Sequence, residues 1–148
     1  GAPYWDQYAR GAIIGITRGT SAAHLTRAAL EGICYQVYDV LMAMENDIHA
    51  KPKEIRVDGG AIANNFLMQF QADICRCPVV RPRVLETTAL GAAYLAGLAI
   101  GYWKDVDELK DQWSLDNIFS AEMHEETAEA LLTEWHKAVG RSLNWAAE

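Results

Sequence analysis

The spacing of apolar residues predicts that strands and helices alternate along the chain. Residues 11–16, GAIIGI, are apolar and β-branched between glycines, which predicts a short buried strand. From Ala22 to about Asp47, apolar residues recur every three or four positions, which predicts one long helix. Ser21 or Thr20 is expected to cap its start. The predicted apolar face of this helix consists of Leu25, Ala29, Ile33, Val37, Leu41 and Met44.

The middle of the chain repeats the order of strand and then helix. EIRVD at 54–58 predicts a strand, GGAIA follows as a loop, and Asn64 or Asn65 opens the next helix. The apolar stripe expected on this helix is Phe66, Phe70 and Ile74. A proline ends the helix, and PVVRP at 78–82 predicts a short strand bracketed by prolines.

The last part of the chain predicts helices. Residues 87–100 are rich in Ala and Gly and too few to span a bilayer, which needs ~20 apolar residues, so they predict a buried helix. Thr87 or Thr88 is the expected cap of this helix, after Glu86. DVDELK predicts a short helix or turn, and residues 125–145 predict an amphipathic helix. The order β-α-β-α-β-α-α favours an α/β sheet covered by helices.

Composition and charge narrow the choice of protein class. The chain has 148 residues, 51% of them apolar, which fits one globular domain with a real core. Its 20 acidic residues outnumber 13 basic ones, giving a net charge of −7, and no basic run occurs. We therefore expect binding neither to nucleic acid nor to an anionic membrane. The opening GAPYWDQYAR lacks the pattern of a secretory signal, which favours a cytoplasmic location.

The cysteines and histidines predict no metal site. The three cysteines, Cys34, Cys75 and Cys77, are irregularly spaced and odd in number, as expected for thiols in a reducing compartment. The CRC stretch at 75–77 lacks a second ligand pair, and no histidine has a partner four residues away. We expect buried or half-buried thiols.

The glycine pair in RVDGGAIANN has two explanations, a tight turn or a ligand lying against the backbone. In an open α/β sheet, ligands bind where a strand leads through a loop into a helix. Asp58 at the strand tip is placed to meet a metal-bound water or a backbone N–H, and the amides of Gly59, Gly60 and Ala61 are placed to face a phosphate or a base. The spacing matches neither a P-loop nor a dinucleotide-binding turn.

The other polar residues in the predicted elements indicate no catalytic group. Glu31, Gln36 and Asp39 on the first long helix are polar candidates with two open interpretations, a functional role or a solvated helix face, of which solvation is the simpler. The residues alone do not assemble a nucleophile with a base and an orienting group.

Several stretches together resemble the FGGY family of carbohydrate kinases. GAIIGITRGTSAAHLTRAALE at 11–31 resembles the carboxyl-terminal signature of that family. RVDGGAIANNFLMQFQADI at 56–74, TALGAAYLAG at 88–97 and APYWDQYARG at 2–11 resemble its glycerol-phosphorylating members in particular. The resemblance covers essentially the whole chain and weakens after about Asp111.

This resemblance implies a two-domain enzyme of the ribonuclease H-like, actin and Hsp70 superfamily, with ATP and Mg²⁺ in the cleft between the domains. Residues 1–148 correspond to part of the carboxyl-terminal, nucleotide-binding domain. Within it, Gly60 and Asn64 match positions that contact the nucleotide, and Gly59 and Ala61 lie beside them. The resemblance places the catalytic aspartate and the glycerol-binding residues in sequence before this chain, so we expect no catalytic residue here.

Two consequences follow from that resemblance. The domain is expected to lack most of its first antiparallel strands, which leaves a sheet edge open to self-association, so homo-oligomers are possible. The helix at 125–145 is expected to cover the outer face of the domain. Two alternatives remain, namely an FGGY kinase for a pentulose or a related polyol, and a non-catalytic nucleotide-binding or interaction module of the actin-like superfamily.

Overall fold

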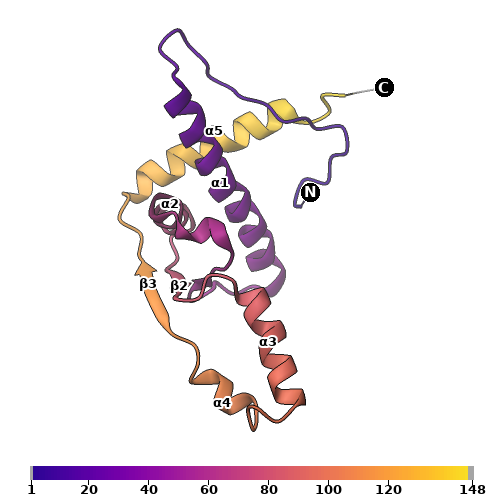
Figure 1. Cartoon of the computed structure of the whole chain (residues 1–148). Helices are drawn as coiled ribbons and strands as arrows, with labels where there is room; N and C mark the ends of the chain where they lie inside the picture. The colour runs from indigo at the N-terminus through magenta and orange to yellow at the C-terminus, as the bar shows by residue number, and fades with distance from the viewer. Residues whose placement is uncertain (1, 147–148) are drawn as a thin grey trace.

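A computed structural model describes residues 2–146 as a small mixed sheet with α1 and α5 packed near one central helix, while α3 and α4 project from the opposite end (Figure 1). The helices are α1 Ala22–Ile48, α2 Asn65–Cys75, α3 Thr87–Ala99, α4 Val106–Lys110 and α5 Glu125–Ser142. The strands are β1 Ile55–Arg56, β2 Val79–Pro82 and β3 Leu115–Phe119, and η1 Gly60–Ala63 is a 3₁₀ helix. The predicted mixed α/β class is therefore confirmed.

The sheet has the order β1-β2-β3. β1 pairs in parallel with β2, and β2 pairs antiparallel with β3, with Val79 opposite both Ile55 and Phe119. β3 was not predicted, because Asp116 and Asn117 are poor strand formers and its residues other than Phe119 are exposed. The pairing with β2 therefore makes residues 115–119 a strand, although their own strand propensity is low.

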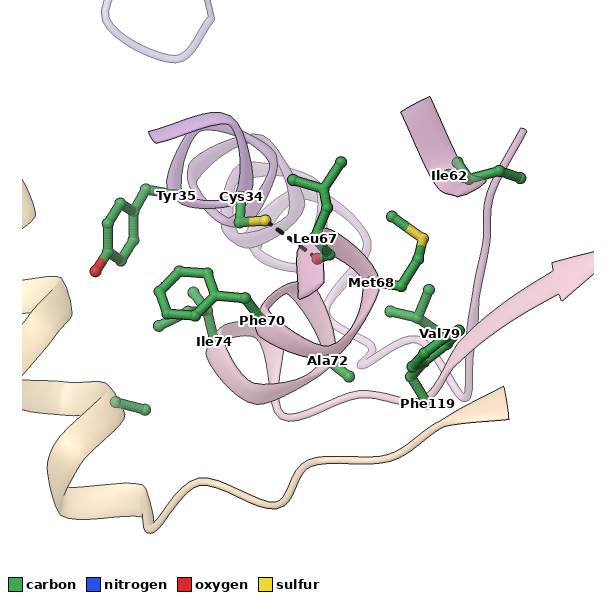
Figure 2. Packing of buried hydrophobic residues seen from close by; sticks show 11 residues of the cluster. Cys34, Tyr35, Ile62, Leu67, Met68, Phe70, Ala72, Ile74, Val79 and Phe119 are labelled. Atoms are coloured by element: carbon green, nitrogen blue, oxygen red, sulfur yellow. Dashed lines mark hydrogen bonds between the residues drawn. The ribbon is translucent and has the colours of Figure 1, made fainter. Parts of the chain in front are cut away.

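α2 is the central helix of the molecule. Eight of its eleven residues are buried, although the sequence predicted only one apolar stripe. Figure 2 shows α2 beside α1, where the Cys34 Sγ–H donates to the Leu67 carbonyl over 3.5 Å. The buried cluster comprises Cys34, Tyr35, Ile62, Leu67, Met68, Phe70, Ala72, Ile74, Val79, Phe119 and Ala128. The core thus joins α1, α2, the sheet and α5.

α1 is confirmed as a long helix with Ser21 as its N-cap, but the predicted apolar face is the wrong one. Cys34 and Tyr35 are buried and Leu30 and Tyr38 pack against them, whereas most of the predicted face is exposed. The exposed residues of that face include Leu25, Ile33, Val37 and Met44. α1 is apolar on more than one side, so periodicity cannot select the side that α2 and α5 cover.

Asp39 is buried, which corrects the interpretation of this residue as part of a solvated helix face. Its carboxylate accepts hydrogen bonds from the Tyr4 hydroxyl at 3.0 Å, Trp135 Nε1 at 2.8 Å and His136 Nε2 at 2.9 Å. Burial, followed by the contact with Asp39, raises the pKa of Tyr4 to about 12. One buried carboxylate therefore ties together the start of the chain, α1 and α5.

Residues 11–16 do not form the predicted buried strand. They lie in an exposed segment without regular secondary structure before α1, and Ile13 and Ile16 are 64% and 61% exposed. None of the strands within residues 2–146 pairs with this segment. An isolated strand leaves its backbone groups without ladder hydrogen bonds, so β-branched residues alone do not produce one.

α3 is also exposed, although the sequence predicted a buried helix. Only Gly97 is buried, and the side chain of Leu95 is 71% exposed. Gly97 lies directly against the Trp103 ring, where no side chain would fit. The helix begins at Thr87, but neither threonine caps it, since Glu86 takes the N-cap position without a side-chain bond. Within the described residues, no helix is both long and apolar enough to cross a membrane.

α5 lies across α1 at the end of the molecule opposite α3 (Figure 1). The Trp135 ring stacks on Tyr35 with 5.2 Å between centroids. The segment after α5 is bonded to the start of the chain. Asn144 N–H donates to Asp6 Oδ2 at 2.6 Å, Ala146 N–H to the Tyr8 carbonyl at 3.0 Å, and Arg10 N–H to the Ser142 carbonyl at 3.3 Å.

The cysteines are buried free thiols, as predicted. Burial raises the pKa of the Cys34 thiol to about 12 and that of Cys75 to about 11. Among residues 2–146, no group of three or more His, Cys, Asp or Glu side chains is placed to hold a metal ion.

Candidate functional site

The glycine turn follows β1 at the edge of the sheet where the two parallel strands end. Val57 still donates to the Val80 carbonyl at 3.3 Å, and the chain then turns at Gly59, with φ 89° and ψ 162°. Only glycine adopts these angles without strain. Gly59 N–H donates to the Leu85 carbonyl at 2.6 Å, so the turn is fixed to the loop that follows β2. At Gly59 the turn itself therefore requires glycine.

Gly60 differs from Gly59, because nothing in the protein requires a glycine there. Its φ lies outside the left-handed region, and a Cβ at this position would meet only Glu86 Oε1, at 3.7 Å. That is an ordinary van der Waals distance. The residue is exposed, as is Ala61 beside it. The missing side chain therefore leaves the backbone of η1 open from outside.

η1 carries the exposed backbone from the turn into α2. The amide of Ile62 donates to the Gly59 carbonyl at 3.1 Å, and that of Asn64 donates to the Ala61 carbonyl at 3.2 Å. The Ile62 side chain is buried, so η1 is anchored in the core while Gly60 and Ala61 stay at the surface. A polar ligand can reach these backbone groups without disturbing the core.

Asn64 is the N-cap of α2. Its Oδ1 accepts the Leu67 N–H at 3.2 Å, and its backbone is extended, with φ −79°. The side-chain NH₂ makes no hydrogen bond with another of residues 2–146. Asn64 is exposed, so these two donors point to a surface at the positive end of the helix.

The loop after β2 forms the second wall of the site. The Thr87 hydroxyl donates to Asp58 Oδ2 at 2.6 Å, which joins the tip of β1 to the first residue of α3. Asp58 thus bonds a side-chain hydroxyl, and the expected contact with a backbone N–H is not made. The start of α3 therefore lies beside the tip of β1, and Glu86 just before it lies close to Gly60 in the turn that leads towards α2.

The sequence analysis missed Arg81, and it named Thr87 only as a helix cap and not as the partner of Asp58. The Arg81 side chain lies mostly inside, and its Nη1 donates to the Ile62 carbonyl at 2.9 Å and to Asn65 Oδ1 at 2.8 Å. A single arginine between Val80 and Pro82 gives no periodic signal. Only its position on β2 beside η1 shows what it contacts.

Two hollows in the surface of the described residues bear on this loop, one distant from it and one beside it. A pocket of about 510 Å³ lies between residues 10–14, α1 and α5, lined mainly by apolar side chains such as Ile13 and Val139. A smaller hollow of about 210 Å³ is lined by Asp58, Thr87 and Trp113, among others. The four predicted residues Gly59, Gly60, Ala61 and Asn64 line neither hollow but form an open ledge beside the smaller one.

Comparison with known proteins gives the chain its relatives. Residues 1–100 match the model of the FGGY family of carbohydrate kinases, C-terminal domain. The chain is 88% identical over 146 residues to a glycerol kinase of Parabacteroides distasonis, covering 99% of this chain and 29% of that protein. It therefore spans less than a third of the length of this relative.

Solved structures share the fold. Plasmodium falciparum glycerol kinase with ADP matches with a TM-score of 0.82 and 35% identity, over 96% of this chain and 28% of that one. Ligand-bound xylulose kinase from Lactobacillus acidophilus matches with a TM-score of 0.68 and 30% identity, over 95% of this chain and 29% of that one. This likeness confirms the predicted ribonuclease H-like fold.

Proposed function

The chain belongs to the FGGY family of carbohydrate kinases, and from this premise we propose that it is part of the nucleotide-binding domain of an ATP-dependent glycerol kinase. The complete kinase, meaning the longer protein that carries this chain, would transfer the γ-phosphoryl group of ATP to glycerol. The observation that carries the proposal is the 88% identity to a glycerol kinase over 99% of the chain.

The glycine ledge is the proposed contribution of this chain to the nucleotide site. Gly60 leaves the backbone of η1 accessible, with Gly59 and Ala61 beside it, and Asn64 offers a side-chain NH₂ at the start of α2. Backbone amides and an amide donor suit the polar edge of a base or the oxygens of a ribose or phosphate. The crystal structure of the Plasmodium glycerol kinase is a complex with ADP, a nucleotide that has such a base, ribose and phosphates.

Phosphoryl transfer needs groups that this chain is not proposed to supply. The reaction requires positioning and charge neutralisation on both sides of the γ-phosphoryl group, usually with Mg²⁺ bound by phosphates and a few carboxylates. The described residues contain no cluster that fits a metal ion, so we assign no Mg²⁺ ligand to this chain. The catalytic base and the glycerol site are assigned to the remainder of the complete kinase.

The exposed apolar surface supports the proposal that the rest of the same polypeptide packs here. Ile13 and Ile16 and the outer face of α1 are exposed, and the second edge of β1 has no partner within residues 2–146. An apolar surface of this extent is unusual on a protein that acts alone. About 70% of the length of the Parabacteroides relative lies outside the match and is available to cover it.

A chimera tests the proposed function. In it, this chain replaces the matching part of the Parabacteroides distasonis glycerol kinase, and ADP release is measured with glycerol, with xylulose and without acceptor. We expect turnover that depends on glycerol, at roughly 1–100 s⁻¹ as is typical of kinases. The 148-residue chain alone should release no ADP above background.

Two results would contradict the proposal. A folded chimera that fails to phosphorylate glycerol would show that this chain does not serve a glycerol kinase. Turnover by the isolated chain would show that the catalytic groups are present in it after all. The likeness to xylulose kinase makes a pentulose kinase the second candidate; for that candidate, the complete kinase should prefer xylulose to glycerol.

A further inference from the structure

We propose that Arg81 is a positioning residue of the nucleotide site, which it serves by holding the backbone carbonyl of Ile62 before Asn64 and the side chain of Asn65 after it. The inference rests on the proposed function, because Asn64 is its proposed nucleotide contact. Arg81 itself lies on β2, behind the ledge, and is not proposed to touch the ligand.

The guanidinium of Arg81 bridges three parts of the molecule. Nη1 donates to the Ile62 carbonyl at 2.9 Å and to Asn65 Oδ1 at 2.8 Å, while Nε donates to Asp116 Oδ2 at 2.6 Å. The group also lies over the Phe119 ring, 5.0 Å from its centroid. With only 12% of its side chain exposed, the plane of the guanidinium is fixed by β3 on one side and by the η1–α2 junction on the other.

These contacts surround the one residue whose geometry matters most for the proposed site. Ile62 lies two residues before Asn64 and Asn65 directly after it, so both flanks of Asn64 are bonded to the same nitrogen. The junction is where η1 ends and α2 begins, and carbonyls at a helix end lack intrahelical partners. Satisfying one of them from a neighbouring strand fixes the angle between the two helices.

Arginine is suited to this role in a way that lysine is not. Its planar fork presents several N–H groups in fixed directions, whereas the lysine ammonium is a single point on a flexible stem. One ammonium cannot reach Asp116 on β3 and both acceptors on the η1–α2 junction in the same geometry. The alternative is a purely structural role, in which Arg81 only strengthens the pairing of β2 with β3 through its ion pair with Asp116.

The test compares Arg81→Met with a matched control, Arg56→Met, in the complete kinase. Arg56 lies on the neighbouring strand, pairs with Glu54 at 2.7 Å and lies over the Trp113 ring at 5.2 Å, but it bonds no residue of the ledge. Three quantities are measured for each variant, namely the dissociation constants for ADP and for glycerol and the hydrogen exchange of peptides covering residues 59–68. Arg81→Lys and Asp116→Asn are milder variants that serve if Arg81→Met does not fold.

We expect Arg81→Met to weaken ADP binding roughly tenfold, the equivalent of about one well-placed hydrogen bond. Glycerol binding should stay within about twofold, and exchange at 59–68 should increase, while Arg56→Met changes none of the three. If Arg81→Met exchanges faster at 59–68 but binds ADP as before, the inference is overturned, because its premise that Asn64 contacts the nucleotide is then wrong. Unchanged exchange with weaker ADP binding overturns the positioning role while the proposed function stands. A lower melting temperature with both other readouts unchanged leaves Arg81 as a strand-pairing residue only.

Discussion

Replacing Asn64 by alanine and, separately, by aspartate distinguishes its role as a helix cap from its proposed role at the nucleotide. The cap consists of one hydrogen bond, from the Leu67 N–H to Oδ1 at 3.2 Å, on an exposed side chain. Alanine removes the acceptor, and caps of this kind contribute roughly 0.5–2 kcal/mol to the free energy of unfolding. Since the bond is long and solvated, we expect a loss of about 1 kcal/mol for Asn64→Ala, or roughly 2–4 °C in melting temperature for a domain of this size.

Asn64→Asp should leave stability nearly unchanged, because aspartate keeps the acceptor and caps about as well as asparagine. Its negative charge at the start of α2 interacts favourably with the helix dipole, by about 0.3–1 kcal/mol. The melting temperature of this variant is therefore expected at or slightly above that of the parent protein. The two substitutions thus move stability in different directions.

For nucleotide binding, Asn64→Asp is expected to be the more harmful of the two substitutions, although it is the less harmful one for stability. Asn64→Asp removes the side-chain NH₂ donors and adds a negative charge that repels phosphates within about one Debye length, ~8 Å at physiological salt. We expect the dissociation constant for ADP to rise roughly 5- to 150-fold, which corresponds to about 1–3 kcal/mol. Asn64→Ala loses the donors without the repulsion, so its effect should be smaller.

Calorimetric titration of the complete kinase with ADP and with glycerol, together with thermal unfolding of each variant, measures these effects. Repeating the ADP titration at several salt concentrations separates the two causes, because salt screens the added charge but does not restore the lost hydrogen bond. If Asn64→Asp binds ADP like the parent and is equally stable, Asn64 is a cap alone and the assignment of the site is wrong. An unchanged melting temperature for Asn64→Ala would refute the estimate that the cap contributes about 1 kcal/mol to the free energy of unfolding.

Four further predictions concern the glycine turn, the buried carboxylate and the buried thiol. Gly59→Ala should cost about 1–3 kcal/mol in urea unfolding, because alanine resists these backbone angles; an unchanged midpoint would contradict the strain argument. Gly60→Val should keep its circular dichroism spectrum and lose ADP affinity far more than glycerol affinity, whereas equal losses would indicate a turn without a ligand. Asp39→Ala should lower the free energy of unfolding by about 1–3 kcal/mol, since buried donors lose their acceptor, and a neutral result would contradict this. The pKa of Cys34 rises from 9.0 to about 12 on folding. Its contribution to the free energy of unfolding is therefore complete below pH 9 and is lost as the pH rises towards 12, by up to ~1.4 kcal/mol per pH unit. Cys34→Ala should make the free energy of unfolding depend less steeply on pH in that range, and an unchanged slope would refute this.

The sequence predicted those elements whose signals are local. α1, α2, β2 and α5 follow from periodicity and from caps such as Ser21 and Asn64, which act within a few residues. The prediction failed where a distant partner decides the outcome. β3 exists because β2 offers a ladder to it, and residues 11–16 are not a strand because no described strand pairs with them.

The candidate site was predictable only as a segment. The glycine pair after a strand located the ledge, but its supporting contacts join residues far apart in the sequence. Thr87 bonds Asp58 across 29 positions, and Arg81 bonds Ile62 across 19. The distinction between Gly59, which the turn requires, and Gly60, which it does not, depends on backbone angles and on neighbours that composition does not encode.

The hydrogen bonds between residues 6–10 and residues 142–146 determine how the molecule responds to a pulling force. Three hydrogen bonds hold them, from Asn144 to Asp6, from Ala146 to Tyr8 and from Arg10 to Ser142. A force that pulls the two segments apart must break these three bonds, which lie outside the buried core. Further extension then acts on Asp39, where Tyr4 and α5 meet α1. Under tension the molecule should therefore shed its outer segments first and keep α2 and the sheet folded until last.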